Sequence, residues 1–284
     1  MPDSVPQTSS GYRERDANQQ RDATPRSTST LVHMLCTIGA GVVFDAAAFQ
    51  EAACWRRYNF VSTAMHLLIL GATGPCGLLL IQEALEADHT VVAYVRSPQK
   101  LTEPIKSNPA VTIVEGQLTD RSALQQALSG VDAVLSALGP PVRSGITYPL
   151  NTPLAQAYTL LIELMKEKEI KRLIALGTPS MKDEHDKFSL VFRTLVTGVA
   201  TFAHGAYKDV VAIGEVIRNQ GDALSWTIVR VPFLVDNPSK EIIAGYIGDG
   251  KVTIKLSRAG FAAFCLKQLQ SDDWANKAPL VSLP

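Results

Sequence analysis

Residues 66–77 read HLLILGATGPCG, and this stretch decides the fold. Its apolar run, Leu67–Leu70, has the composition of a buried strand, and the apolar residues 78–81 after the glycines suit the start of a helix. A tight turn between a strand and a helix N-terminus exposes backbone N–H groups, which bind phosphate. The spacing GxxGxxG therefore predicts a turn that holds the pyrophosphate of a dinucleotide.

The three glycines of this turn are expected to have different roles. Gly71 lets the chain leave the strand, and Gly77 lets the helix pack closely against the sheet. Gly74 removes the side chain that would separate the pyrophosphate from the backbone. Cys76 also lies in the turn, where we interpret it as a small apolar spacer. The alternative is a reactive thiol activated by the helix N-terminus.

The second strand, Thr90–Val95, indicates which cofactor binds. It ends in Arg96, at the position where the adenosine ribose of a dinucleotide lies. Chains that bind NAD normally place an acidic residue there, whereas arginine offers a bidentate cation to a 2′-phosphate. We therefore predict NADP(H) as the cofactor. The alternative is that Arg96 is an ordinary solvated arginine in a surface loop.

The composition excludes some classes of function. The chain has 284 residues, of which 46% are hydrophobic, so it is long enough to bury a full core. Its 27 basic and 27 acidic side chains give no net field that would attract nucleic acid or an anionic membrane, so we expect neither partner. The four cysteines are scattered without the spacing of a metal site, which indicates a reduced, cytoplasmic protein.

The N-terminal residues differ in composition from the rest. Residues 1–30 contain almost no large apolar side chains, so we expect them to be disordered. Residues 31–49 are apolar, but His33 and Asp45 interrupt them, which argues against a membrane segment. Met65 stands immediately before the first strand. We therefore expect residues 1–64 to be a dispensable or non-native leader and residues 65–284 to form the functional domain.

Strands and helices alternate after this leader. The predicted strands are Leu67–Leu70, Thr90–Val95, Val111–Glu115, Ala133–Leu138, Arg172–Leu176 and Trp226–Val231. The predicted helices are Pro75–Ala87, a segment from Asp120 to Leu128, Leu154–Lys168 and a kinked region over Phe188–Asn219. This order predicts an α/β fold with a doubly wound parallel sheet, in which ligands bind at the carboxyl ends of the strands.

The chain from about residue 232 onward is expected to form a small C-terminal lobe that selects the substrate. Short strands are predicted over Glu241–Ile247 and Lys251–Lys255, and Ser257 is expected to cap a helix that runs through Gln268. Residues 188–207 are apolar but interrupted by Arg193. We therefore predict that they cover the substrate cleft as a helix, in preference to a membrane span.

Further motifs follow in order: GQLTD at 116–120, VDAVLSALG at 131–139, KRLIALGT at 171–178 and WTIVRVPFL at 226–234. With the glycine turn they resemble the atypical short-chain dehydrogenase/reductases, and among these the NmrA-like regulators and the flavin (biliverdin IXβ) reductases. The resemblance covers the chain from Met65 onward and implies a Rossmann fold that binds NAD(P).

The resemblance also assigns residues to parts of the cofactor. These are Thr73–Gly77 for the pyrophosphate, Arg96 for the 2′-phosphate, Leu118 for the adenine, Leu138 and Gly139 for the nicotinamide ribose, and Thr178 for the nicotinamide, with Pro232 and Phe233 on its other side. One residue departs from the family pattern. Gln117 replaces the aspartate that commonly caps the adenine amino group, which puts that contact in doubt.

The proton donor is a second departure. Many family members use a Tyr-x-x-x-Lys pair, in which one helical turn brings the ammonium beside the phenol. No tyrosine of this chain has a lysine four residues later, and Val211 follows Tyr207 at that spacing. The candidate catalytic residues are therefore Tyr207 and Thr178, whereas His204 is interpreted as a partly buried structural histidine. The alternative is that Tyr207 only packs against its neighbours and that water supplies the proton.

Two functions are consistent with these features. The first, which we favour, is an NADP(H)-dependent oxidoreductase that reduces a small organic acceptor such as a carbonyl, enone, quinone or flavin. Side chains available to sandwich a flat substrate are Phe188, Phe192, Phe233 and Tyr246. The second is a non-catalytic NADP(H)-sensing regulator, which the missing Tyr/Lys pair favours. The sequence identifies neither the acceptor nor the oligomeric state.

Overall fold

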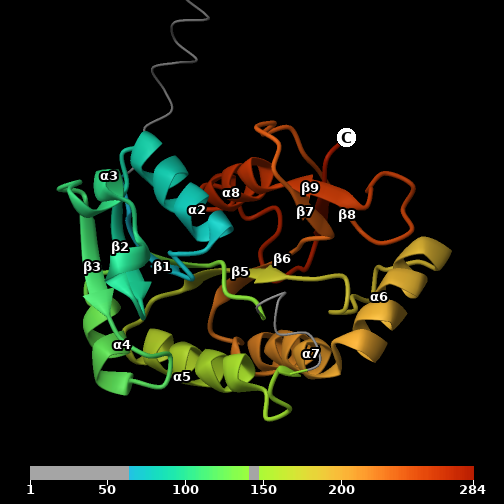
Figure 1. The fold of residues 1–284 in the computed structure, drawn as a ribbon, viewed down its shortest axis with the longest axis horizontal. Helices are drawn as coiled ribbons and strands as arrows, with labels where there is room; N and C mark the ends of the chain where they lie inside the picture. Colours follow the sequence, from blue (N-terminus) through green and yellow to red (C-terminus); the bar gives the residue numbers. More distant parts are fainter. Residues whose placement is uncertain (1–63, 141–146) are drawn as a thin grey trace, which may run out of the picture. The chain divides into compact units, whose positions relative to one another are not determined.

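The computed structural model describes residues 64–140 and 147–284 of the chain. The predictions for a leader fall on residues 1–63, outside the described residues, as do residues 141–146 of the loop after the fourth predicted strand. Within the described residues, strands and helices alternate along the chain in the predicted order until about residue 232 (Figure 1).

A mostly parallel sheet forms the centre of this part of the chain (Figure 1). Its strands are β1 (His66–Leu70), β2 (Thr90–Val95), β3 (Val111–Glu115), β4 (Ala133–Ser136), β5 (Arg172–Gly177), β6 (Ser225–Arg230), β8 (Ile243–Gly245) and β10 (Leu280–Ser282). They lie in the order β3-β2-β1-β4-β5-β6-β10-β8, and β8 runs antiparallel to β10. The chain moves outward from β1 to β3 and then in the other direction from β4 to β6. The predicted doubly wound sheet is therefore confirmed, and its topological switch point lies between β1 and β4.

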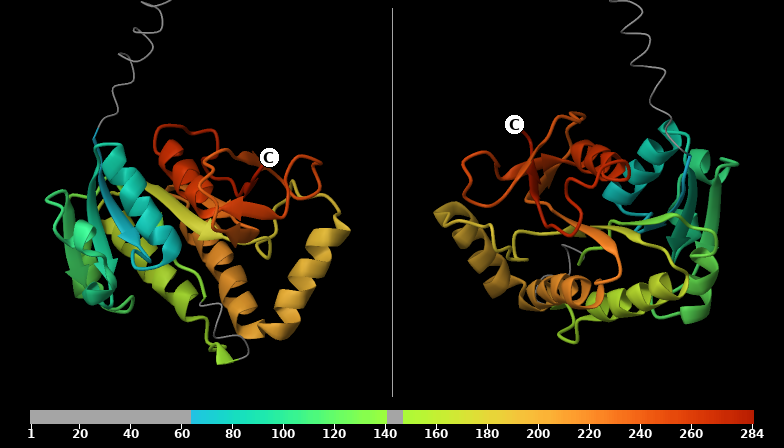
Figure 2. Two further views of the ribbon diagram at one scale, coloured as in Figure 1. Left: turned by 45° about the horizontal axis from the view of Figure 1, so that its top comes forward. Right: turned by 180° about the vertical axis from the view of Figure 1, so that it is seen from behind.

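Helices cover both faces of the sheet (Figures 1 and 2). The helices are α2 (Pro75–Glu86), α3 (Glu103–Lys106), α4 (Arg121–Ala127), α5 (Pro153–Glu167), α6 (Leu190–Phe202), α7 (His204–Gln220) and α8 (Arg258–Lys267), with a short 3₁₀ turn, η1 (Pro98–Lys100). Of the two residues that the sequence offers as the cap of α4, Thr119 and Asp120, it is Asp120 whose side chain accepts a hydrogen bond from the Ala123 N–H, at 3.0 Å.

The apolar run of β1 is explained by burial on both faces. Successive side chains of a strand point to opposite faces, so a strand covered on both sides has no polar positions to alternate. Leu68 and Leu70 pack in the core cluster that contains α5 and α7 side chains. Leu67 and Ile69 pack in the other cluster, which includes Phe261 of α8. The end of β1 is therefore held from both sides.

The long helical region predicted over Phe188–Asn219 consists of two helices, α6 and α7, which meet at Ala203 (Figure 2). The predicted kink is thus a full break. Phe192 is the one buried residue of α6, so this helix has little contact with the core. Among residues 64–140 and 147–284, no helix combines the length and the apolar character needed to cross a bilayer.

The residues from about 232 onward were predicted to form a separate small lobe, but part of this segment joins the main sheet. Strands β7 (Phe233–Val235) and β9 (Lys255–Ser257) form a small parallel pair of their own, whereas β8 and β10 extend the main sheet. The predicted strand over Lys251–Lys255 is displaced, because β9 begins only at Lys255. Ser257 caps α8 as predicted, accepting a hydrogen bond from the Gly260 N–H at 2.9 Å.

Candidate active site

A cavity of about 430 Å³ lies at the carboxyl ends of β1 to β4, at the switch point of the sheet. Residues from the ends of these strands meet there, as parallel strands require. The segment before and at the start of α5 completes the lining. The lining residues are Gly71–Thr73, Tyr94–Arg96, Gly116–Thr119, Leu138, Gly139, Tyr148, Pro149, Pro153 and Leu154.

The cavity contains many of the residues that the sequence assigned to the cofactor. Those in its lining are Gly71, Thr73, Arg96, Leu118, Leu138 and Gly139. The rest of the glycine turn, Gly74–Gly77, follows directly after Thr73 and forms the start of α2. Thr178 is not among the lining residues, so its predicted place near the nicotinamide stays a prediction.

The turn between β1 and α2 is shaped by close backbone approaches. Gly71 has a φ of +73°, and a Cβ there would lie 2.9 Å from the carbonyl carbon of Ala137. A Cβ at Gly77 would lie 2.2 Å from the Gly71 carbonyl oxygen. At Gly74 a Cβ would lie 3.3 Å from the same oxygen and within 4 Å of no other heavy atom outside its chain neighbours, so it is less crowded by the fold than Gly71 and Gly77.

The start of α2 offers donors that suit a phosphate group. Gly74 is the N-cap and has no side chain that could cap the helix, and Pro75 lacks an N–H. The N–H groups of Cys76 and Gly77 lie in the first turn, where no carbonyl of the helix can accept from them. These donors and the positive end of the helix dipole fit a pyrophosphate.

The structure favours the spacer interpretation of Cys76. Its side chain is buried and packs in the core cluster with α8. Burial raises the pKa of the Cys76 thiol to about 11, although the charge of Arg258 lowers it in part. A thiol with a raised pKa has little thiolate at neutral pH, which makes it a poor nucleophile.

The part of the cavity around Leu118 depends on Tyr94, which sequence reasoning missed. Its phenol donates a hydrogen bond to the Gln117 carbonyl oxygen at 2.7 Å, which fixes the backbone beside Leu118. A Cβ at Gly116 would lie 2.3 Å from the Tyr94 oxygen, so glycine is required there. Burial raises the pKa of Tyr94 to about 12, and Asp120 adds to the shift. The Gln117 side chain is exposed.

The segment Tyr148–Leu154 forms a wall of the cavity that the sequence had not assigned to the cofactor. It follows a loop without periodic apolar pattern, so only its tyrosine and prolines could have pointed to it. Behind the wall, Tyr158 of α5 is fully buried and donates a hydrogen bond to Ser136 at 2.7 Å. Burial raises the pKa of Tyr158. Tyr158 therefore supports the end of β4 and does not reach the cavity.

The predicted proton donors do not meet in the cavity. Tyr207 is half-buried near the start of α7 and is not a lining residue. The Thr178 hydroxyl accepts a hydrogen bond from the Ser180 N–H at 3.3 Å. His204 is exposed, so the prediction of a partly buried histidine is wrong. It lies at the break between α6 and α7, where its ring is within 3.3 Å of the Ala200 carbonyl oxygen but stays open to solvent.

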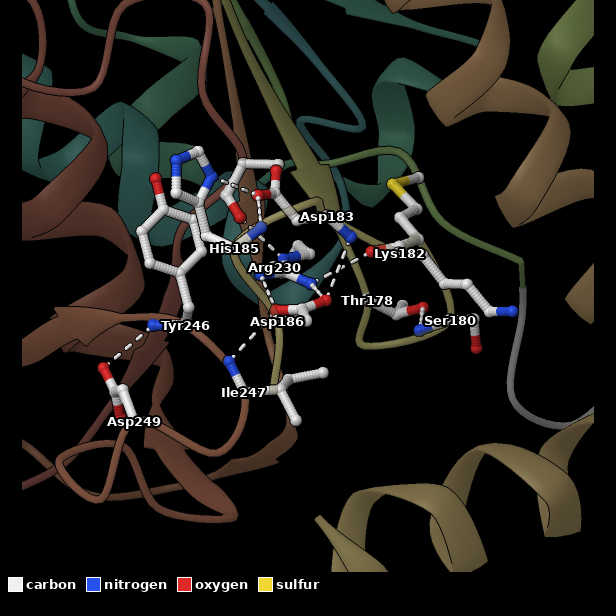
Figure 3. A network of polar contacts seen from close by, with 12 residues as sticks. Thr178, Ser180, Lys182, Asp183, His185, Asp186, Arg230, Tyr246, Ile247 and Asp249 are labelled. Atoms are coloured by element: carbon white, nitrogen blue, oxygen red, sulfur yellow. Dashed lines mark hydrogen bonds and ion pairs between the residues drawn. The ribbon is translucent and has the colours of Figure 1, made fainter. Parts of the chain in front are cut away.

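An ion pair holds the segment that follows β5 (Figure 3). Arg230 is fully buried at the end of β6, and its guanidinium contacts the Asp186 carboxylate at 2.6 and 2.8 Å. It also donates to the carbonyl oxygens of Met181 at 3.1 Å and Ala278 at 2.6 Å. Asp186 in turn accepts from the Ile247 N–H at 3.0 Å. The pair therefore ties the Thr178 segment to the C-terminal part.

Two of the four aromatic residues proposed for the substrate are already engaged. Phe192 is buried against Ile247, which makes it a core residue. Tyr246 stacks on His185 with 4.6 Å between ring centroids (Figure 3). The prediction that Phe192 contacts a substrate is therefore wrong, whereas that for Tyr246 stays a prediction. Phe188 and Phe233 remain 75% and 55% exposed.

Residues 71–272 match the family model for NAD(P)H-binding proteins. The chain is 27% identical over 232 residues to a probable pinoresinol-lariciresinol reductase 3 of Arabidopsis thaliana, a match that covers 77% of this chain and 67% of that protein. It is 27% identical over 187 residues to oxidoreductase stcQ of Emericella nidulans, covering 61% of this chain and 66% of that protein. The matches thus span about two thirds of the length of these two relatives.

A solved structure shows the same fold. A short-chain dehydrogenase/reductase of Veillonella parvula in complex with NADP superposes with a TM-score of 0.64 at 18% identity, covering 78% of this chain and 95% of that chain. At this identity the likeness concerns the arrangement of the elements, which agrees with the doubly wound sheet.

Replacing Asp186 tests the ion pair behind the β5 segment. Asp186→Asn leaves the Arg230 guanidinium buried without a counter-charge, so we expect the free energy of unfolding to fall by about 3–5 kcal/mol. Urea denaturation measures this loss. The matched control is Asp236→Asn, which removes an exposed carboxylate paired with Arg258 and should cost less than about 1 kcal/mol. Equal losses in the two variants would contradict the assignment.

A side chain at Gly74 tests the turn as a phosphate site. Gly74→Val should abolish the binding of both NADPH and NADH in calorimetry while the circular dichroism spectrum stays native, because the valine occupies the pyrophosphate position. Gly198→Val is the control, since a Cβ at Gly198 of α6 meets nothing within 4 Å. Intact affinity in Gly74→Val would mean that the turn is merely structural.

Proposed function

Because this chain belongs to the NAD(P)H-binding family of atypical short-chain dehydrogenase/reductases, we propose that it reduces a small organic acceptor with NADP(H). It is an NAD(P)-dependent oxidoreductase, as its relatives are named reductases and oxidoreductases. Bound in the cavity, the reduced nicotinamide supplies a hydride. The acceptor class that we propose comprises carbonyls, enones, quinones and flavins.

One observation carries the proposal: the cavity at the switch point is lined by the same strand ends that the motifs had assigned to a dinucleotide. The glycine turn provides the phosphate donors, Leu118 lies where the adenine is expected, and Leu138 and Gly139 lie at the end of β4. Doubly wound sheets bind ligands at this edge for a geometric reason, because adjacent helices diverge there.

Arg96 supports NADP(H) over NAD(H). It lines the cavity at the end of β2, and its side chain is exposed. Within residues 64–140 and 147–284, no carboxylate forms an ion pair with it. A guanidinium that the protein leaves unpaired at the ribose position is available for two hydrogen bonds to a 2′-phosphate.

A flat, apolar acceptor fits the surface beyond the cavity. Phe233 is exposed and begins β7, three residues after β6 ends, and Phe188 is exposed in the segment between β5 and α6. Large exposed aromatic side chains at a ligand edge provide contact area for an apolar ring. The relative from Arabidopsis thaliana, named a pinoresinol-lariciresinol reductase, agrees with an organic acceptor of this kind.

We propose water as the source of the proton, with Tyr207 and Thr178 as the candidate protein donors. Tyr158 is buried away from the cavity, and Tyr148 directs its hydroxyl to Asp209 at 2.6 Å. Neither phenol is free to give a proton to an acceptor. Electron-poor acceptors need little acid assistance, so the protein's role is to orient the reactants and exclude competing water. The reductase names of the relatives give the regulatory alternative no support.

The proposal is tested by mixing the purified protein with NADPH and a panel of quinones, flavins, enones and aldehydes while following nicotinamide absorbance. Acceptor-dependent oxidation of NADPH is the expected result. Tight NADPH binding without turnover of any acceptor would favour a sensor of the cofactor instead.

The charge at position 96 should set the choice between cofactors. Arg96→Glu is expected to weaken NADPH binding by about 1.5–3 kcal/mol, because a carboxylate repels the 2′-phosphate, while NADH binding changes little. Titration of nicotinamide fluorescence measures both affinities. Lys168→Glu, a like charge change at the far end of α5, is the control. Equal losses for NADPH and NADH would refute the assignment of Arg96.

The proton source is tested by two substitutions. If water gives the proton, Tyr207→Phe and Thr178→Val should retain most activity toward quinones, and Tyr207→Phe should leave NADPH affinity nearly unchanged. If Tyr207 is instead the acid, Tyr207→Phe should lower turnover by about 10²–10⁴-fold, which is the usual contribution of general acid catalysis. Steady-state rates with a quinone and a carbonyl substrate distinguish the two cases.

A further inference from the structure

A buried carboxylate outside the predicted site contacts the wall of the cavity. Asp209 of α7 is fully buried. Its carboxylate accepts hydrogen bonds from the Tyr148 hydroxyl at 2.6 Å, the Leu154 N–H at 3.0 Å and the Ala155 N–H at 2.9 Å. Charged groups are seldom buried without such partners, because leaving water is costly. The three donors all belong to the segment that begins at Tyr148 and enters α5.

This carboxylate replaces a missing cap. The N-cap residue of α5, Thr152, has a φ of +50°, and its side chain makes no cap hydrogen bond. The first N–H groups of a helix have no partner within the helix and carry its positive dipole end. Asp209 satisfies two of them from another helix. The start of α5 is therefore fixed by α7 and not by its own sequence.

α7 makes a second close contact with the segment Tyr148–Leu154. A Cβ at Gly205, in the first turn of α7, would lie 2.5 Å from the Tyr148 carbonyl oxygen and 3.0 Å from the Pro149 carbonyl oxygen. This contact involves backbone only and carries no charge. Gly205 and Asp209 are one helical turn apart, so the same face of α7 meets the wall twice.

The contacted segment lines the cavity. Its members in the lining are Tyr148, Pro149, Pro153 and Leu154. We propose that Asp209 is a positioning residue of the cofactor site, which holds the wall Tyr148–Leu154 against the bound NADP(H). The inference rests on the proposed function of the cavity. It assigns a role in binding to α7, a helix whose residues do not line the cavity within the described part of the chain.

Tyr148 acts through its position and not as an acid. Its hydroxyl donates to the carboxylate of Asp209, so the proton points away from an acceptor. Burial raises the pKa of Tyr148, and the hydrogen bond and charge of Asp209 raise it further. A phenol held in this way keeps its proton through the neutral range.

Three variants perturb the wall in different ways. Asp209→Asn removes the charge, and an amide cannot accept at all three positions. Tyr148→Phe removes one hydrogen bond but leaves the cap of α5. Gly205→Ala displaces the wall by contact while every hydrogen-bonding group is kept. The controls are Gly198→Ala, where a Cβ meets nothing within 4 Å, and Asp222→Asn, an exposed carboxylate paired with Lys166.

The measurements are the Kd of NADPH from nicotinamide fluorescence, kcat and the KM of NADPH with a quinone, and the Tm. We expect Asp209→Asn and Gly205→Ala to raise the Kd and KM of NADPH by about tenfold, which corresponds to about 1.4 kcal/mol. Tyr148→Phe should raise them by roughly threefold, and kcat at saturating NADPH should stay near that of the native protein. Neither control should change the Kd.

A merely structural role gives a different result. In that case Asp209→Asn and Gly205→Ala lower the Tm, but the folded fraction binds NADPH with native Kd, and the proposal is overturned. If Asp209→Asn does not fold, Gly205→Ala and Tyr148→Phe decide the question by the same criterion. If the native protein itself does not bind NADPH, the proposed function fails first, and this outcome is distinct from the loss of affinity in the variants alone.

Discussion

The rest of the structure depends on the close approach of Gly77 to the carbonyl oxygen of Gly71. A Cβ at position 77 would lie 2.2 Å from that oxygen, so the first turn of α2 lies directly against the end of β1. Core packing on both faces of β1 holds this strand end in place. The N–H groups of the helix start therefore have a fixed position at the carboxyl edge of the sheet. Packing density, more than any single hydrogen bond, shapes the turn that we propose as the phosphate site.

The elements that could be predicted from the sequence are those that follow a simple local pattern. Buried parallel strands read as short apolar runs, and the runs at β1, β2 and β5 were located to within a residue of their observed ends. Because parallel strands bring their carboxyl ends to one edge, knowing the strands also places Arg96, Leu118 and Leu138 beside the glycine turn. The caps at Asp120 and Ser257 were predictable for a similar reason, since each contact spans three residues.

The unpredicted parts depend on contacts between residues far apart in the chain. Asp209 and Arg230 are charged residues that a sequence pattern assigns to the surface, yet both are fully buried and paired with distant partners. Phe188 and Phe192 have the same side chain and lie four residues apart, but Phe188 precedes α6 and is exposed, whereas Phe192 meets the core. The local periodicity of the sequence does not indicate which distant residues will contact a given side chain. The segment Tyr148–Leu154 was not assigned to the cofactor for this reason.

The position of β10 has a consequence for how the chain folds during synthesis. β10 lies between β6 and β8 in the sheet, although β8 precedes it in the chain. β8 therefore has no neighbour to pair with until residues 280–282 have been made, and the Ala278 carbonyl that receives the Arg230 guanidinium arrives equally late. Until then β6 presents an open edge, which is the type of surface that pairs with other chains. The nascent protein thus keeps an unpaired strand edge until residues 280–282 have been made.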